Sequence, residues 1–270
     1  MGTKVDSAAN GWSGYSTCPG NYIPIGFGEV DLHGSKESQM NDLMVVPGAG
    51  FKVYCGASSC SLWGLCGRVV GPSGTNILKV ASSPPVIGGP GWGPVSTCPA
   101  NTRVIGHSRM DLHGSPTSIN VEANHYMCDL GANQNGCSTY FRNSQGTTSS
   151  MCASLESSSY MLDIQQGAQV VSSAAGWTQP AGCEAGYQIV GFQEMDNYSQ
   201  APDDINHFKI RNNGAQVYYN GGRGNVRAMC GKVLLCTGLP ANAQIKYTDT
   251  ASAYKTSGGC PYTCTGGYTG

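Results

Sequence analysis

Short apolar stretches bounded by turn residues recur along the chain and predict β-strands. Residues 22–25, 103–105 and 187–190 are rich in β-branched and aromatic side chains, with Gly, Pro or Asn at their borders. No ten-residue segment shows the i, i+3, i+4, i+7 apolar spacing of an amphipathic helix. The 39 glycines and 14 prolines would also interrupt long helices. We therefore expect an all-β fold.

The predicted strands belong to three copies of one unit. Each copy opens with Gly-Trp, and a cysteine, a glycine and an aspartate follow at constant spacing. The recurring positions are Trp12, Cys18, Gly26 and Asp31 in the first copy, Trp92, Cys98, Gly106 and Asp111 in the second, and Trp177, Cys183, Gly191 and Asp196 in the third. The copies close on Leu-Cys-Gly-Arg-Val, Met-Cys-Ala-Ser-Leu and Met-Cys-Gly-Lys-Val. Three consistent registers indicate internal duplication, not chance.

The repeats define the expected organisation. We expect one compact, disulfide-rich domain with pseudo-threefold symmetry, in which three sheets form a β-prism-like arrangement with about four or five short strands per unit. Its parts are an N-terminal lead (1–10), three units (11–90, 91–175 and 176–247) and a cysteine-containing tail (248–270).

The 13 cysteines favour disulfides over metal sites, because paired metal-type spacings are missing. The two cysteines that recur in every copy give the simplest pairing, which is Cys18–Cys66, Cys98–Cys152 and Cys183–Cys230. Copies one and two each hold a further pair, Cys55 with Cys60 and Cys128 with Cys137. Cys236, Cys260 and Cys264 would supply one bridge and one unpaired thiol. Disulfides predict an oxidising compartment, and we expect a secreted protein, processed from a longer precursor because the first residues lack an apolar signal core.

Charge narrows the choice of partners. Only 11% of residues are charged, against about 25% in an ordinary domain, and the net charge is −1. No Lys/Arg cluster is present to displace counterions from phosphates, so we expect no nucleic-acid partner. A surface of hydroxyls, amides and backbone repels neighbours weakly and is easily desolvated, which favours contact with proteins or neutral glycans.

The order Gly-Trp, Cys-Pro, glycine-aromatic, acidic strand and cysteine resembles the vitelline membrane outer layer protein family, whose fold is a threefold β-prism. The third copy carries the resemblance best, in Cys183, Gly186-Tyr187, Gly191-Phe192 and the segment 203–206. The chain also resembles the cysteine-rich C-terminal β-prism module of apicomplexan perforin-like proteins. The first resemblance implies an extracellular coat or matrix protein with possible glycan binding, and the second implies membrane docking. In copy two, His107 stands in place of the family's aromatic residue.

Two Asp-Leu-His segments are candidates for metal ligation. Asp31 with His33, and Asp111 with His113, would place a carboxylate and an imidazole on one face of a strand. The third copy lacks the histidine, and an aspartate at a strand end commonly accepts hydrogen bonds from turn amides. The structural interpretation is favoured, and we expect no metal or other cofactor.

Aromatic residues supply the candidate contact surfaces. The three recurrent tryptophans are expected to be buried, because packing explains a repeated indole best. Leu62, Trp63 and Leu65 lie between two cysteines; core packing is favoured, and an exposed lipid-inserting tip is the alternative. Tyr140, together with Tyr218 and Tyr219, could form platforms for sugar rings or contacts in a protein lattice.

No Gly-x-Ser-x-Gly, His-Glu-x-x-His or phosphate-binding loop is present, so we expect no enzyme. The predicted function is a non-catalytic extracellular matrix or recognition module that binds partner proteins, further copies of itself or glycans. The alternatives are a membrane-docking module of a pore-forming protein, whose partner would be lipid, and a lectin. Asn197 lies in the one glycosylation sequon.

Overall fold

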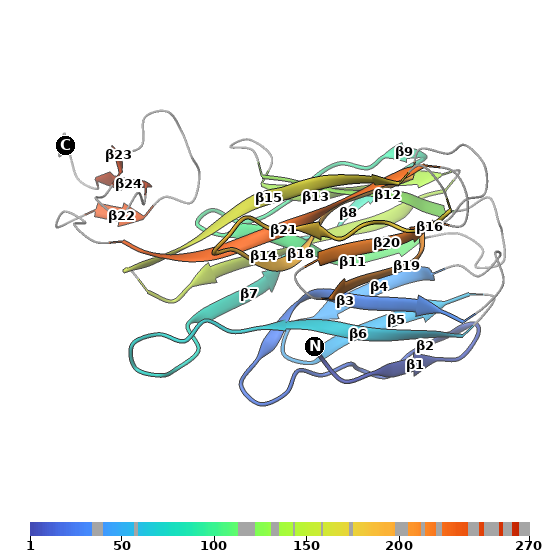
Figure 1. Cartoon of the computed structure of the whole chain (residues 1–270), viewed down its shortest axis with the longest axis horizontal. Helices are drawn as coiled ribbons and strands as arrows, with labels where there is room; N and C mark the ends of the chain where they lie inside the picture. Colours follow the sequence, from blue (N-terminus) through green and yellow to red (C-terminus); the bar gives the residue numbers. More distant parts are fainter. Residues whose placement is uncertain are drawn as a thin grey trace.

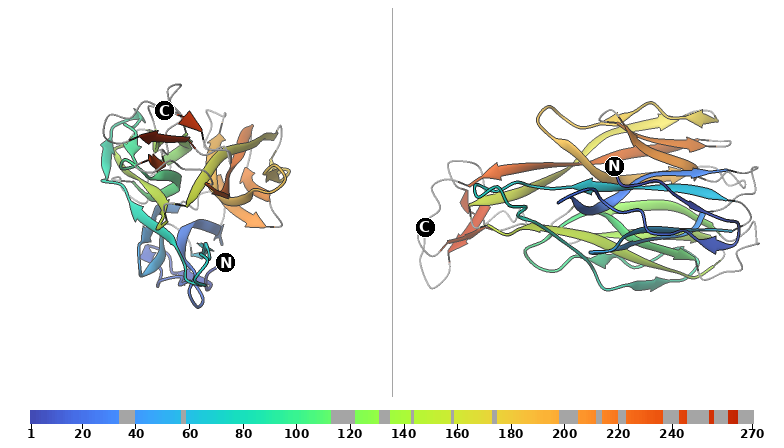
Figure 2. Two further views of the ribbon diagram at one scale, coloured as in Figure 1. Left: turned by 90° about the vertical axis from the view of Figure 1, so that its left-hand side faces the viewer. Right: turned by 90° about the horizontal axis from the view of Figure 1, so that it is seen from below.

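The computed structural model is an all-β protein with three antiparallel sheets arranged as a prism (Figure 1). It describes residues 1–33, 40–56, 59–112, 122–130, 135–142, 144–157, 159–172, 175–197, 205–211, 214–219, 223–236, 243–245, 254–255 and 261–264. Seen along the long axis, the three sheets surround a common core, which confirms the predicted fold class (Figure 2). Within the described part of the chain, no helix is long and apolar enough to cross a membrane.

Each large sheet has seven strands, which lie side by side in the following order. Sheet I contains β1 (Val5–Ser7), β6 (Cys60–Gly67), β3 (Ile23–Leu32), β19 (Ile205–Arg211), β20 (Gly214–Tyr219) and β16 (Gly176–Trp177), with β17 (Ala181–Gly182) also on β20. Sheet II contains β2 (Gly11–Trp12), β5 (Gly50–Cys55), β4 (Met40–Val46), β11 (Arg103–Leu112), β14 (Gly146–Leu155) and β7 (Leu78–Ser82), with β8 (Val86–Gly88) also on β14. Sheet III contains β10 (Ser96–Thr97), β13 (Gly136–Arg142), β12 (Glu122–Asp129), β18 (Gln188–Asn197), β21 (Gly224–Leu235) and β15 (Tyr160–Ser172), with β9 (Gly91–Trp92) also on β13. A small fourth sheet is formed by β22 (Ala243–Ile245), β24 (Pro261–Cys264) and β23 (Tyr254–Lys255).

The repeated units exchange strands between sheets. The first unit gives β3 and β6 to sheet I and β4 and β5 to sheet II, and the other two units continue the same pattern. The third unit closes the ring, because its β19 pairs with β3 of the first unit. No unit therefore has a complete sheet of its own, and each depends on its neighbours for pairing.

The recurrent glycines mark bulges in the central strand of each sheet. Register shifts fall next to Gly26 in β3, Gly106 in β11 and Gly191 in β18, and a second shift follows a few residues later in each strand. A β-carbon on Gly191 would lie 2.4 Å from the carbonyl oxygen of Ile105, so the backbones of β18 and β11 approach too closely for a side chain there. Close approach therefore explains the glycine at 191, whereas Gly106 has a positive φ of 146° and a β-carbon on Gly26 would meet only an ordinary contact at 3.5 Å.

One continuous hydrophobic core fills the space between the sheets. It includes fully buried residues from all three, such as Val30 of sheet I, Val104 of sheet II and Val226 of sheet III. Leu62 and Leu65 belong to this core, with exposed fractions of 0% and 8%. They lie in strand β6, not in a projecting loop, so the lipid-tip alternative is wrong for these two leucines and core packing is confirmed for them.

Five disulfides join the described cysteines. Three of them, Cys18–Cys66, Cys98–Cys152 and Cys183–Cys230, have Cα–Cα distances of 5.6 to 5.7 Å and occupy equivalent places in the three units. These are the pairs that the repeat registers predict. Cys236 is also disulfide-bonded. Cys260 and the side chain of Cys264 lie outside the described residues.

The two additional disulfides are not equivalent to each other. Cys55–Cys60 links β5 of sheet II to β6 of sheet I, whereas Cys128–Cys137 links two neighbouring strands within sheet III. The place of Cys55–Cys60 is taken in the third unit by Tyr219, whose hydroxyl donates to the carbonyl of Asn225 at 2.7 Å. The first unit thus connects the two sheets at this place with a disulfide, and the third unit connects them with a buried tyrosine hydrogen bond.

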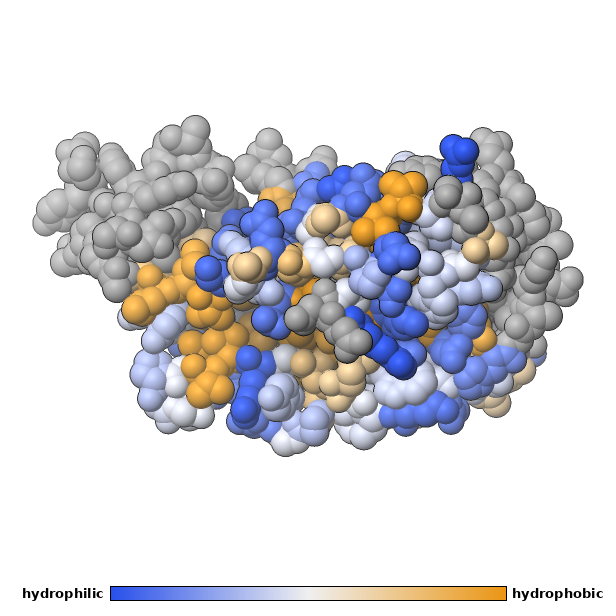
Figure 3. All heavy atoms as spheres, in the orientation of Figure 1, coloured by the Kyte–Doolittle hydropathy of each residue, from blue (hydrophilic) through white to orange (hydrophobic). Residues whose placement is uncertain are grey.

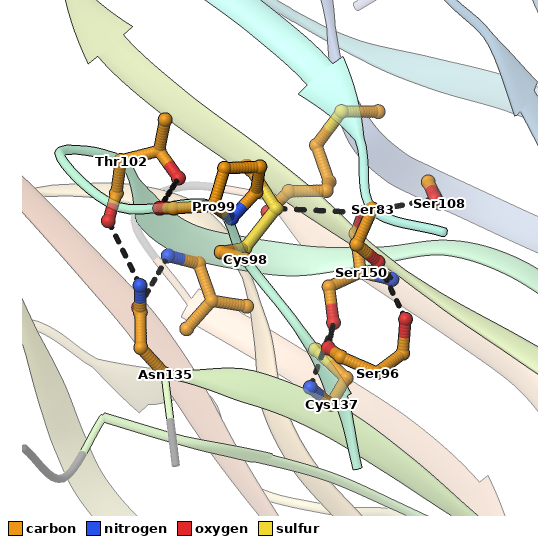
Figure 4. The surroundings of a disulfide bond; sticks show 12 residues. Ser83, Ser96, Cys98, Pro99, Thr102, Ser108, Asn135, Cys137 and Ser150 are labelled. Carbon is orange, nitrogen blue, oxygen red and sulfur yellow. Dashed lines mark hydrogen bonds between the residues drawn. A yellow bond between two sulfur atoms is a disulfide. The ribbon is translucent and has the colours of Figure 1, made fainter. Parts of the chain in front are cut away.

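Buried hydroxyl groups form a hydrogen-bonded network around the Cys98–Cys152 disulfide of the second unit (Figure 4). The amide of Cys137 donates to Ser150 Oγ at 2.7 Å, and the amide of Ser150 donates to Ser83 Oγ at 2.7 Å. Asn135 holds the neighbouring loop, since its side-chain amide donates to the carbonyl of Thr102 at 2.8 Å. Small hydroxyl and amide side chains satisfy the buried backbone here without any charge.

Candidate recognition site on each sheet

The three recurrent tryptophans are exposed on the outer faces of the sheets. Trp12, Trp92 and Trp177 have exposed fractions of 43%, 51% and 40%. The prediction that they are buried is therefore wrong. Each indole belongs to a two-residue strand at one end of a sheet, and that strand pairs with β5, β13 or β20. Each tryptophan in these short strands faces solvent on the outer side of its sheet. The recurrence of tryptophan therefore repeats a surface feature, not a core position.

The residue after each tryptophan ties the short strand to its neighbour. The amides of Ser13, Gly93 and Thr178 donate to strand carbonyls at 2.8 to 2.9 Å. In the first and third units the hydroxyl of that residue also accepts a hydrogen bond from the partner strand, at 3.1 Å. The indoles are thus held on an ordered backbone.

A cluster of polar and aromatic residues lies beside each tryptophan. Four residues in direct cross-strand register form a row on each outer face. Cluster I comprises Trp177, Tyr218, His207 and Asp31; cluster II comprises Trp12, Tyr54, Asp42 and Asp111; cluster III comprises Trp92, Tyr140, His125 and Asp196. The recurring aspartate of the sequence is the last member of every row.

The ring geometry is nearly the same in the three clusters. The tryptophan and tyrosine centroids lie 5.6 Å apart in cluster I, 5.7 Å in cluster II and 5.8 Å in cluster III, always edge to face. In clusters I and III the histidine packs on both rings, with its centroid 5.0 to 5.3 Å from the tyrosine. Edge-to-face packing fixes these rings while each indole stays 40% to 51% exposed.

Contacts with aspartates across the unit boundary orient the imidazoles. His207 Nδ1 lies 2.7 Å from Asp31 Oδ1, and His125 Nδ1 contacts Asp196 Oδ1. Partial burial lowers the pKa of His207, and the carboxylate of Asp31 opposes that shift in part. The backbone amide of Leu32 also donates to His207 Nδ1 at 3.1 Å, so the neighbouring unit holds this ring in place.

Lysines complete two of the clusters. Lys209 Nζ lies 3.7 Å from the centroid of the Trp177 ring, and Lys52 Nζ lies 4.3 Å from that of Tyr15 and 6.0 Å from that of Trp12. These are cation–π contacts, which keep an ammonium donor beside an aromatic face.

The tyrosines selected from the sequence have different roles. Tyr140 and Tyr218 lie in clusters III and I, half-buried and packed edge to face against the tryptophans. Tyr219 is fully buried, and its hydroxyl donates to backbone carbonyls. The hypothesis that Tyr219 contacts a ligand is therefore wrong, because successive strand residues face opposite sides of the sheet. Trp63 is half-buried on the outer face of sheet I, beneath Lys4.

Asp31 and His33, the weak candidates for metal ligation, have other partners in the structure. Asp31 Oδ2 lies 3.9 Å from His33 Nε2, but Asp31 pairs with His207, and the same His33 nitrogen contacts Ser61 Oγ at 2.9 Å. Asp111 contacts Arg109. His113 lies outside the described residues, as does the side chain of Asn197.

One group of potential metal ligands occurs among the described residues, namely His107 with Cys128 and Cys137. The two sulfurs are bonded to each other, so they cannot act as thiolate ligands. Ser61, His33 and Asp31 likewise lack the geometry of a catalytic triad. The hydroxyl and the carboxylate both lie on the same imidazole nitrogen, and Ser61 is fully buried.

Sequence reasoning missed the histidines, His125 and His207, and the two lysines. The partners of Asp31 and Asp196 lie on strands contributed by other units, so no local spacing connects them.

Comparison of the sequence with known proteins assigns no family. No protein-family model matches the chain, and no curated protein shows significant sequence similarity to it.

Proposed function

We propose that this protein is a non-catalytic recognition module that binds neutral glycans through clusters I, II and III. The observation that carries the proposal is the threefold repetition of an exposed indole next to a tyrosine and a carboxylate in register. A flat, exposed indole packs against the C–H face of a sugar ring. Carboxylate, imidazole and ammonium groups beside it exchange hydrogen bonds with the hydroxyls.

Three similar sites suit a ligand that carries repeated sugars. Each site alone is shallow and would bind weakly, but simultaneous engagement raises the overall affinity because the later contacts become intramolecular. The net charge of −1 and the small share of charged residues favour a neutral polar ligand over a phosphate-rich one.

We propose that the protein acts outside the cell. Five disulfides are consistent with an oxidising, extracellular environment. The resemblance to vitelline membrane outer layer proteins supports a coat or matrix role, in which the module links glycans or glycoproteins. Membrane docking has less support, because Leu62 and Leu65 are part of the core.

A glycan array tests the proposal with four proteins: the wild type, the triple variant Trp12→Ala/Trp92→Ala/Trp177→Ala, the most exposed single variant Trp92→Ala, and Trp63→Ala as control. We expect binding to neutral glycans that falls at least tenfold in the single variant on a dense array and disappears in the triple variant. Trp63→Ala should bind as the wild type does, because Trp63 lies outside the clusters. Retained binding by the triple variant, or no wild-type binding, would contradict the proposal, and thermal melts check that all four proteins fold.

A further inference from the structure

A cavity opens at the end of the prism where β7 lies, apart from the three clusters. Its volume is about 710 Å³, within the roughly 300–1,000 Å³ typical of small-molecule sites. Apolar side chains gather on this end of the molecule, over β7 and the end of β21 (Figure 3). Residues of all three units contribute to its lining.

The cavity follows from the pseudo-threefold symmetry. Its wall includes Ile25, Ile105 and Val190, which occupy the same place in the three units, just before the recurrent glycine. The residue after each closing cysteine is also part of the lining, and it is always small: Gly67, Ala153 and Gly231.

The small residues keep the space open. A β-carbon on Gly67 would lie 2.7 Å from Cδ1 of Ile25, and one on Gly231 would lie 2.8 Å from Cγ1 of Val190. Larger side chains at these positions would therefore press on the apolar wall. Further leucine, isoleucine and valine residues complete the lining, among them the buried Leu162 and the half-buried Ile189.

Two cations lie in the lining next to the small residues. Arg68 and Lys232 follow Gly67 and Gly231 and are exposed to solvent. Arg68 donates to the side chain of Asn21 at 2.8 Å, and its guanidinium lies 4.6 Å from the centroid of Tyr22. Among the described residues, neither cation has a salt bridge.

Lys232 forms no salt bridge with either of the two carboxylates that influence Tyr187, Asp163 and Glu184. Asp163 is the cross-strand neighbour of Lys232, but it accepts a hydrogen bond from the hydroxyl of Tyr187. The negative charge of Glu184 helps to raise the pKa of the same tyrosine. Lys232 instead lies 5.5 Å above the Tyr187 ring. The lining thus combines an apolar wall with the guanidinium of Arg68 and the ammonium of Lys232, and no carboxylate of the described residues lies within 4 Å of either.

We propose that this cavity binds one single-chain amphiphile with an anionic headgroup, its alkyl chain on the apolar wall and its headgroup at Arg68 and Lys232. Charge complementarity selects the headgroup, because neither Arg68 nor Lys232 has a salt bridge among the described residues and Arg68 donates one hydrogen bond, to Asn21. Burial of the chain supplies affinity, at roughly fourfold per buried methylene.

Isothermal titration calorimetry with monomeric dodecanoate tests the proposal. We expect saturable binding of one dodecanoate per protein, at least tenfold tighter than octanoate. The filling variants Val190→Trp and Val69→Trp should each weaken binding at least tenfold, whereas Ile87→Trp, an exposed apolar site on sheet II, should leave it unchanged. The double variant Arg68→Gln/Lys232→Gln should weaken dodecanoate at least fivefold while dodecanol binds as before.

The remaining outcomes count against the proposal. Absence of saturable dodecanoate binding overturns it, as does equal binding by both filling variants once their melts match the wild type. If the double variant binds dodecanol and dodecanoate with equally reduced affinity, the two cations do not recognise an anionic headgroup and that part of the proposal is wrong. Binding to vesicles of anionic phospholipid without binding of monomeric dodecanoate would assign the apolar end to a membrane surface instead.

Discussion

His107 makes the stability of the fold dependent on pH, and His107→Phe should remove that dependence. The residue lies in the core of the second unit, with an exposed fraction of 6%, where the first and third units have Phe27 and Phe192. Its Nε2 lies 3.2 Å from the carbonyl oxygen of Ser138. Phenylalanine therefore already fits the equivalent place in the two other units.

The magnitude follows from the pKa of the buried imidazole. Burial lowers the pKa of His107 from 6.5 to about 4, against the opposing effect of the Ser138 carbonyl. The unfolded chain thus binds a proton more readily than the folded protein does. Stability is complete above about pH 6.5 and is lost as the pH falls toward 4, by about 2 kcal/mol at pH 5 and about 3 kcal/mol in total.

Urea unfolding at pH 7.5 and pH 5.0, followed by tryptophan fluorescence, measures this loss. The wild type should lose about 2 kcal/mol more than His107→Phe between the two pH values. Every other titrating group is common to both proteins and cancels in the comparison. Equal losses in the two proteins would refute the reasoning, whatever the absolute stability of the variant.

Three further predictions concern stability. Tyr219→Phe should cost about 1–2 kcal/mol in urea unfolding, because the carbonyls of Asp196 and Asn225 lose a buried donor; an unchanged midpoint would contradict the role given to that hydroxyl. Gly191→Ala should lower the free energy of unfolding by about 2 kcal/mol or more. Gly26→Ala should cost less than about 1 kcal/mol, because its β-carbon would lie 3.5 Å from the nearest backbone oxygen. Similar costs for the two variants would show that close approach at the bulge is not the reason for glycine at 191. Replacing Cys183 and Cys230 together by alanine should lower stability by about 3–4 kcal/mol, since the bridge spans 47 residues, and an unchanged melting temperature would show that the core suffices.

The fold could be predicted from the sequence because the repeat registers contain the topology. Three copies with the same cysteine and glycine positions require three similar environments, and short β-type segments leave sheets as the means of forming them. The exchange of strands between units could not be predicted. Only pairing such as that of His207 with Asp31 shows it, and those residues are far apart in the chain.

The candidate sites were predicted less well, for a specific reason. Repetition of Trp12, Trp92 and Trp177 fits a buried core position and an exposed site equally well, and sequence alone does not separate the two. Tyr218 and Tyr219 illustrate the same limit. Adjacent strand residues point to opposite faces of the sheet, and only the pairing register decides that Tyr218 faces outward and Tyr219 is buried.

The most direct test of the central claim is a titration of the four tryptophan indole N–H signals by NMR with the neutral oligosaccharide that binds best on the array. The signals are assigned by the single Trp→Ala variants. If clusters I, II and III are the recognition sites, the indoles of Trp12, Trp92 and Trp177 shift and saturate together, and that of Trp63 stays in place. A shift confined to Trp63, or no shift in the three cluster indoles at saturating ligand, would contradict the account.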